Sequence, residues 1–389
     1  MTNYPDYVVP PPKAAYIHIP FCISKCGYCD FNSFPGMESL FDGYVDALVR
    51  EIIRTGREHK QTNRLDSVYF GGGTPTVLPT DKLINILAAI GDTFDLAEDC
   101  EITLEANPGT VDQSKLAQLR SAGFNRLSLG VQSLDDEFLS AIGRIHTARE
   151  ALDAYVWARS SGFTNIGIDL IFALPRQTLK HWESALNAVV GMYPEHISLY
   201  ELSIEEGTEF AELCAEGQLD LPDEELGLEM YEAAIATLTA AGYEHYEVSN
   251  FARAGFRSRH NQVYWYNESY FGFGAGATSY VNGVRSVRLS DPRRYVEAIN
   301  REEDPVESSE RLTGRHRLAE TLIQGLRLLE GVDLRRFRDD TGLDAIDSFR
   351  EEISSLVRNG LVEVSEGRLR VTHKGLLLMN DVAVELIPT

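Results

Sequence analysis

The sequence contains no apolar run that approaches the roughly twenty residues of a membrane-spanning helix. Its first residues, MTNYPDYVVPPPK, include neither the basic segment nor the apolar stretch of a secretory signal peptide. Cysteine is scarce, with five among 389 residues, and no paired spacing indicates a disulfide framework. Free thiols fit a reducing compartment, so we expect a cytoplasmic protein without an integral membrane segment.

Basic residues are also few, because 36 Lys and Arg stand against 59 Asp and Glu, which gives a formal net charge of −23. A protein that binds nucleic acid through its phosphates needs a basic surface, so this balance argues against a nucleic-acid partner. It equally disfavours electrostatic docking on anionic lipid. We attribute the acidity to solubility rather than to a function.

What the chain does contain is a repeated alternation of strand-like and helix-like segments. Strands are expected at 15–19, 67–70, 101–107, 126–133, 165–175 and 196–202. Helices are expected at 37–58, 80–90, 111–122, 135–142, 148–161, 177–190 and 222–241. Strands separated by helices of this length indicate a parallel α/β sheet built from βα units. Six units rather than eight predict a partial TIM-like (βα)6 barrel, open on one side, with functional residues at the strand C-terminal ends.

The pattern changes after about residue 251. We therefore divide the chain into an extended segment (1–12), a barrel (13–250), a connecting segment (251–310) and a C-terminal domain (311–389). Residues 264–280 are rich in aromatics and glycine and are expected to form a packed turn. The C-terminal domain is predicted to be α+β and winged-helix-like, with helices, two short strands and a final helix. Residues 301–389 carry 13 basic and 18 acidic side chains, which favours a lid or docking role over DNA binding.

Three cysteines follow the first predicted strand within eight residues, namely Cys22, Cys26 and Cys29 in the spacing C-x3-C-x2-C. Thiolates are soft ligands that select iron–sulfur clusters or zinc, and a structural zinc site would want a fourth Cys or His nearby. Cys100 and Cys214 are far away in the sequence. Buried apolar cysteines are the alternative, but aromatic and charged neighbours indicate a loop. A cluster with three protein ligands leaves one iron open to another molecule.

With the aromatic Tyr28 before its last cysteine, this motif resembles that of the radical S-adenosylmethionine superfamily. YIHIPFC followed by YFGGGTPT resembles the anaerobic coproporphyrinogen III oxidases and their relatives, the HemW-type heme chaperones, over almost the whole chain. The resemblance implies a [4Fe–4S] cluster on the three cysteines, whose open iron chelates the amino acid end of S-adenosyl-L-methionine. It also implies an electron donor. Residual cleavage of S-adenosylmethionine and its loss are both compatible with the motif.

Gly71 to Gly73 follow a predicted strand, where glycine lets the backbone approach a ligand and leaves N–H groups free. A tight strand-to-helix turn is the alternative. The resemblance implies that this loop and residues near other strand ends contact S-adenosylmethionine. The implied contact residues are Tyr16, Tyr28, Gly72, Gly73, Thr74, Glu105, Gln132, Arg144 and Asp169. For the charged members, a salt-bridged place on the barrel rim is the alternative. His18 is expected to be a hydrogen-bonded structural histidine.

Further features separate the members of this family. The decarboxylating oxidases have a fourth cysteine two places after the third, where this chain has Phe31. Residues 260–265, HNQVYW, match the HNxxYW motif of the chaperones, and the chain begins only about fifteen residues before its first predicted strand. We therefore expect a heme chaperone that delivers heme to an acceptor protein. An oxygen-independent coproporphyrinogen III oxidase and a radical enzyme that modifies RNA are the alternatives.

The motif match further implies that His260 is an axial ligand of the heme iron, a common role of neutral imidazole. If the segment is helical, His260 and Tyr264 lie four residues apart on one face. The alternative is an aromatic core plug that closes the barrel mouth, with His260 bonded to a backbone carbonyl.

Overall fold

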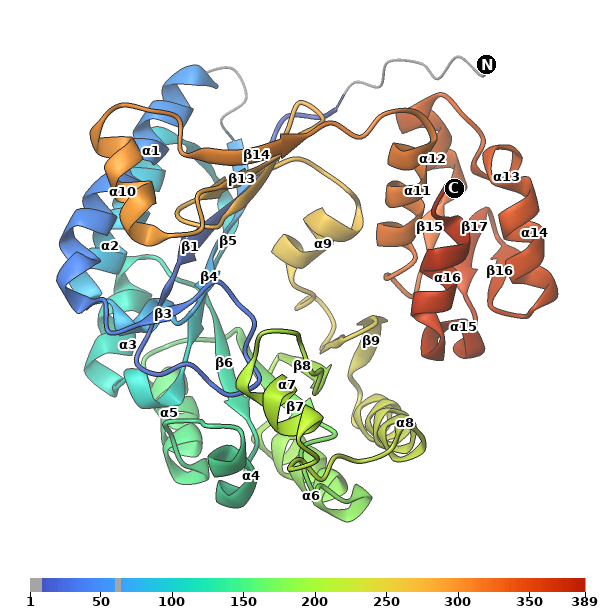
Figure 1. Cartoon of the computed structure of the whole chain (residues 1–389), viewed down its shortest axis with the longest axis horizontal. Coiled ribbons are helices and arrows are strands. Elements are labelled where there is room, and N and C mark those ends of the chain that lie inside the picture. The colour runs from blue at the N-terminus through green and yellow to red at the C-terminus, as the bar shows by residue number, and fades with distance from the viewer. Residues whose placement is uncertain (1–8, 60–63, 389) are drawn as a thin grey trace.

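The computed structural model describes residues 9–59 and 64–388 of the chain. The predicted extended segment at 1–12 therefore lies mostly outside the described residues. The described chain forms one large curved sheet with helices on its outer side, and a smaller, mainly helical unit lies beside it (Figure 1).

Six neighbouring strands in the middle of the sheet are all parallel. They are β1 (Ala14–Ile19), β4 (Arg64–Gly72), β5 (Asp95–Ala106), β6 (Arg126–Gln132), β7 (Ile166–Phe172) and β8 (His196–Glu201). The intervening helices are α1 (Phe41–Glu58), α2 (Thr80–Thr93), α3 (Gln113–Ala122), α4 (Asp136–Ala141), α5 (Ala148–Ser160) and α6 (Leu179–Met192). Strands such as β7, IGIDLIF, are almost continuously apolar and buried, as expected for a parallel sheet covered on both faces. The predicted partial barrel is confirmed.

The sheet continues beyond these six strands on both sides and does not close. After α7 (Glu209–Ala215) and α8 (Glu224–Ala240), β9 (Glu244–Glu247) and β10 (Asn250–Ala252) extend one edge. Helix α9 (Arg259–Trp265) precedes β11 (Tyr270–Phe273), which pairs with β1, and β12 (Thr278–Val281), β13 (Val284–Arg288) and β14 (Val306–Glu310) follow. Helix α10 (Pro292–Asn300) lies against α1.

The prediction of a packed turn at 264–280 is wrong, because this segment includes most of the hairpin β11–β12. Gly272 explains how two strands fit where the composition indicates a turn. A Cβ atom at Gly272 would lie 2.0 Å from the carbonyl oxygen of Thr278, so only glycine permits this approach of the two strands.

The C-terminal unit has a hydrophobic core of its own, built from residues between Leu318 and Leu386. Its helices are α11 (Gly314–Gly325), α12 (Leu334–Thr341), α13 (Ala345–Ser348), α14 (Arg350–Arg358), α15 (His373–Leu377) and α16 (Met379–Leu386). A small antiparallel sheet pairs β15 (Val332–Asp333) and β16 (Val362–Ser365) with β17 (Arg368–Val371). The strand pair and the final helix follow the order that the sequence predicts.

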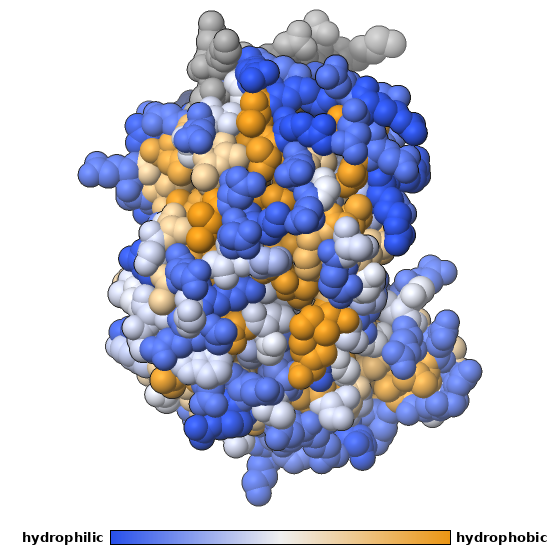
Figure 2. Space-filling view, turned by 90° about the vertical axis from the view of Figure 1, so that its left-hand side faces the viewer, coloured by the Kyte–Doolittle hydropathy of each residue, from blue (hydrophilic) through white to orange (hydrophobic). Residues whose placement is uncertain are grey.

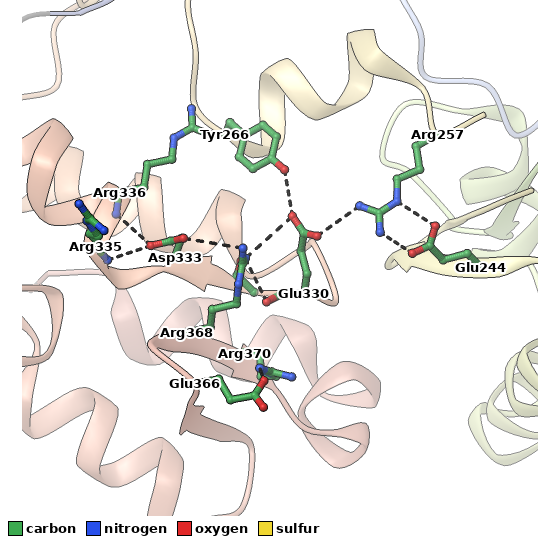
Figure 3. A network of polar contacts seen from close by, with 11 residues as sticks. Glu244, Arg257, Tyr266, Glu330, Asp333, Arg335, Arg336, Glu366, Arg368 and Arg370 are labelled. Carbon is green, nitrogen blue, oxygen red and sulfur yellow. Dashed lines mark hydrogen bonds and ion pairs between the residues drawn. The ribbon is translucent and has the colours of Figure 1, made fainter. Parts of the chain in front are cut away.

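Charged and aromatic side chains join this unit to the barrel (Figure 3). Glu330 lies between the two, because it pairs with Arg257 at 3.3 Å and accepts a hydrogen bond from the Tyr266 hydroxyl at 3.0 Å. Arg257 also pairs with Glu244 of β9. Acidic and basic side chains therefore form ion pairs where the C-terminal unit meets the segment around α9.

Helix α1 on the outer side of the sheet is amphipathic. It buries Tyr44, Leu48 and Ile52 against the sheet, while hydrophilic side chains predominate on the face shown in Figure 2, with apolar ones in narrow strips between them. In the described part of the chain, no helix combines the length and the apolar character that crossing a membrane requires.

Candidate functional site

The segment between β1 and α1 carries the three clustered cysteines. Cys22 lies in β2 (Phe21–Cys22), which pairs with β3 (Phe34–Pro35), and the backbone turns between Cys26 and Cys29 through a 3.1 Å hydrogen bond. All three are free thiols of intermediate burial. They line a cavity of about 650 Å³ at the C-terminal ends of the parallel strands. This is the edge of the barrel where the sequence predicts functional residues.

The structure brings eleven of the thirteen predicted site residues to this one cavity. They are Cys22, Cys26, Cys29, Tyr28, Gly72, Gly73, Thr74, Glu105, Gln132, Arg144 and Asp169. Tyr16 lines an adjoining cavity of about 370 Å³, which shares Phe31, Gly72 and Glu105 with the first. His260 lines neither of these two cavities.

The surroundings of the cysteines fit an iron–sulfur cluster better than a single metal ion. Among the described residues, no three His, Cys, Asp or Glu side chains are placed to hold one ion. In a four-iron cluster each thiolate binds an iron of its own, so the three sulfurs need not converge. Burial raises the pKa of Cys22 and Cys29, so these thiols are protonated at neutral pH until a metal replaces the proton.

Two neighbouring elements contact the cysteine sulfurs. The Thr74 hydroxyl lies 3.6 Å from Cys22 Sγ, and Arg144 donates from Nη1 to Cys26 Sγ at 3.6 Å. The loop after β4 and the loop after α4 thus approach the cysteine loop from two sides.

The glycine loop after β4 is shaped for close approach. Gly72 has φ +117°, and a Cβ there would lie 2.7 Å from the His18 ring. The Gly72 N–H donates to Glu105 Oε2 at 3.2 Å, and the Tyr69 hydroxyl donates to Glu105 Oε1 at 2.7 Å. Burial raises the pKa of Glu105 to about 7, so a cationic amino group in the cavity would favour its ionised form.

Some polar groups that line the cavity are incompletely satisfied. Gln132 has the left-handed φ of +64°, unusual for a side chain of this kind, and its buried Oε1 has no hydrogen-bond partner among the described residues. Arg144 Nη2 donates to the Gly130 carbonyl at 2.8 Å, but its buried Nε has no partner in the described chain. Such groups are expected where a polar ligand completes the bonding.

Sequence reasoning missed several polar residues beside the predicted ones. Ser128 donates to both oxygens of Asp169, at 3.2 and 3.0 Å, and Arg126 is buried inside the barrel. Tyr69 donates a hydrogen bond to Glu105. Its role was missed although it is the first residue of the sequence YFGGGTPT. The alternation of side chains along a strand could have found Ser128, because it lies two residues before Gly130 and therefore on the same face of β6.

His18 has the structural role that the sequence predicts. It is buried, its Nδ1 lies 3.0 Å from the Tyr16 hydroxyl, and its Nε2 lies 2.9 Å from the carbonyl oxygen of Asn32. Because a carbonyl only accepts, Nε2 carries the proton, and Nδ1 accepts from Tyr16.

His260 lies inside the barrel on α9, with only 1% of its surface exposed. Its Nδ1 lies 3.0 Å from the Ser67 hydroxyl and its Nε2 lies 2.9 Å from the Tyr264 hydroxyl. Burial and the nearby Arg126 lower its pKa to about 3, so the ring is neutral. The expected helical pairing of His260 with Tyr264 is present. With both nitrogens engaged, this geometry resembles the core-plug alternative, except that the partners are hydroxyls instead of a carbonyl.

Comparison with protein families gives two matches. The radical SAM superfamily matches residues 16–189, and the HemN C-terminal domain matches residues 312–378.

Known proteins resemble the chain over most of its length. It is 40% identical over 371 residues to the heme chaperone HemW of Bacillus subtilis, covering 95% of this chain and 98% of that protein. It is 34% identical to the mouse mitochondrial radical S-adenosyl methionine domain-containing protein 1, covering 96% and 87%. Among solved structures, the coproporphyrinogen III oxidase HemN of Escherichia coli superposes with a TM-score of 0.84 at 26% identity, covering 97% and 90%.

Proposed function

Because the chain belongs to the HemW family of the radical SAM superfamily, we propose that it binds heme and delivers it to an acceptor protein. Besides the acceptor protein, we propose an electron donor as a second partner. Nucleic acid is not a proposed partner, given the net charge of −23. The proposal assigns the protein to the cytoplasm.

In this proposal Cys22, Cys26 and Cys29 hold a [4Fe–4S] cluster and the rest of the cavity holds S-adenosylmethionine. A bound cluster supplies single electrons to the sulfonium, which is the chemistry of the superfamily. The chain's own residues bind and orient. Glu105 is suited to the amino group of the ligand, Arg144 to a thiolate and a carboxylate, and the unpaired Gln132 amide to a donor on the ligand.

The observation that carries the choice of a chaperone is Phe31. It occupies the position of the oxidases' fourth cysteine, it is 64% exposed, and it lines both cavities. A phenyl ring there offers a flat apolar surface and no sulfur chemistry. The similar structure of coproporphyrinogen III oxidase favours that enzyme's activity as the second candidate function.

Ferric heme titrated anaerobically into the cluster-loaded full-length protein tests the proposal. Saturable binding of about one heme per chain, retained through gel filtration and followed by transfer to a heme-free globin, is the expected result. The absence of saturable binding would contradict the chaperone function.

We also propose that the chain divides into four parts, with boundaries after residues 12, 250 and 310. The C-terminal unit is proposed to act as a lid or docking surface, because its charges are compensated at the contact with the barrel and its composition is acidic.

A further inference from the structure

An iron ligand needs a lone pair that faces open space, and His260 offers none in this structure. Each ring nitrogen has a hydroxyl partner, and the ring packs between Tyr16, Tyr69 and Tyr264, with centroid distances of 6.4, 5.0 and 5.2 Å. Direct ligation by His260 would require it to break a buried hydrogen bond and leave this aromatic packing.

Tyr264 lies one turn further along α9 and is less buried than His260. It lines the cavity of about 370 Å³ together with Phe31, Glu105 and other residues. Its hydroxyl lies 2.9 Å from His260 Nε2, so the phenol is held from behind by a neutral imidazole. Tyrosinate is a known protein ligand of heme iron.

We propose that Tyr264 Oη is the protein ligand of ferric heme and that His260 positions it through the Nε2 hydrogen bond. This inference depends on the proposed heme binding and specifies its site. A ferric porphyrin core carries one positive charge, and a phenolate neutralises it, which lowers the cost of taking that charge out of water. A neutral imidazole ligand would leave that charge in place.

The proton balance of this step needs no reductant or oxidant. The iron–oxygen bond forms, the phenol proton goes to water, and the iron remains ferric. Before ligation the Tyr264 hydroxyl donates to Nε2, and Nδ1–H donates to Ser67. After ligation the other tautomer is required, with Nε2–H donating to the phenolate and the Ser67 hydroxyl donating to Nδ1. A hydroxyl accepts or donates equally well, so both hydrogen bonds of His260 survive without movement of the ring.

The same reasoning excludes the other tyrosine–histidine pair of this cavity. The Tyr16 hydroxyl is paired with His18, but the second partner of His18 is the Asn32 carbonyl, which only accepts. His18 therefore cannot change tautomer, and a Tyr16 phenolate would lose its donor. Tyr270→Phe is the matched control, because it removes a hydroxyl from the same cavity at a tyrosine that belongs to neither pair.

The test is resonance Raman and visible absorption spectroscopy of ferric heme bound to full-length wild type, Tyr264→Phe, Tyr270→Phe and His260→Ala. Wild type and Tyr270→Phe should show iron–phenolate vibrations. Tyr264→Phe should lose them and bind heme at least tenfold more weakly. His260→Ala should keep the phenolate vibrations at altered frequency, because its role is to donate to the ligand and not to bind iron. Circular dichroism confirms the folding of each variant.

Two results would overturn the inference. One is heme bound by wild type without phenolate vibrations, and the other is an imidazole-type spectrum that Tyr264→Phe preserves and His260→Ala abolishes. Both leave heme binding itself intact, so they reject the ligand and not the chaperone function. If wild type binds no heme, the proposed function and this inference fall together.

Discussion

Replacing Gly73 by alanine should damage the cysteine loop directly. The Gly73 N–H donates to the Ile19 carbonyl at 2.9 Å and the Thr74 N–H donates to the Phe21 carbonyl at 2.8 Å, which holds the glycine loop against the start of the cysteine loop. A Cβ at Gly73 would lie 2.7 Å from the Phe21 carbonyl oxygen and 3.0 Å from Cys22 Sγ. Both contacts are repulsive, and the nearest atom belongs to the backbone, so Cys22 must shift with it.

Overpacking of this kind costs about 1–3 kcal/mol. We expect Gly73→Ala to lower the free energy of unfolding by that amount and to reduce the iron content after anaerobic reconstitution. Urea denaturation and iron counting measure the two effects. Gly91→Ala is the matched control, because Gly91 lies in α2 with no atom within 4 Å of the added Cβ. That change should stabilise the helix by up to about 1 kcal/mol. Unchanged stability together with full iron loading in Gly73→Ala would refute the packing argument.

The remaining predictions concern the cluster, the pH dependence and the fold. Cys26→Ser should lose the four-iron cluster by visible absorption and iron counting while Cys214→Ser keeps it, and an intact cluster in the first variant would contradict the assignment. The raised pKa of Glu105, about 7 in the fold against 4.5 in the unfolded chain, favours its neutral form, so its contribution to stability is lost as the pH rises through about 7. Urea denaturation of the cluster-free protein should therefore show a larger loss of stability from about pH 5 to about pH 8 than Glu105→Gln shows, and equal slopes would refute this. Glu51→Ala should cost about 3–5 kcal/mol in thermal or urea unfolding, because it leaves the Arg288 guanidinium, now 2.6 Å from the carboxylate, unpaired in a buried place. A loss below 1 kcal/mol would indicate that solvent reaches Arg288.

The sequence predicted best those features that are local in the chain. Strand and helix periodicity predicted the six βα units, and the spacing of Cys22, Cys26 and Cys29 predicted their common loop. The parallel topology then brought Glu105 and Asp169 to the same edge, because parallel strands share their C-terminal side.

Long-range pairing was not predictable in the same way. The hairpin β11–β12 was missed because its aromatic and glycine content is also typical of turns, and its register depends on contact with β1. The environment of His260 depends on Ser67, which is 193 residues away in the chain. The motif match indicated that a nitrogen of His260 binds the heme iron. Only the fold shows that hydroxyl groups already form hydrogen bonds with both ring nitrogens.

This radical SAM scaffold is proposed to handle heme and not to decarboxylate its precursor. The most direct test incubates the anaerobically reconstituted protein with coproporphyrinogen III, S-adenosylmethionine and a chemical reductant, and follows the porphyrin products by chromatography. With Phe31 in place of a fourth cysteine, we expect no protoporphyrinogen IX, while the same preparation binds ferric heme. Sustained formation of protoporphyrinogen IX, with S-adenosylmethionine consumed in proportion, would contradict the account.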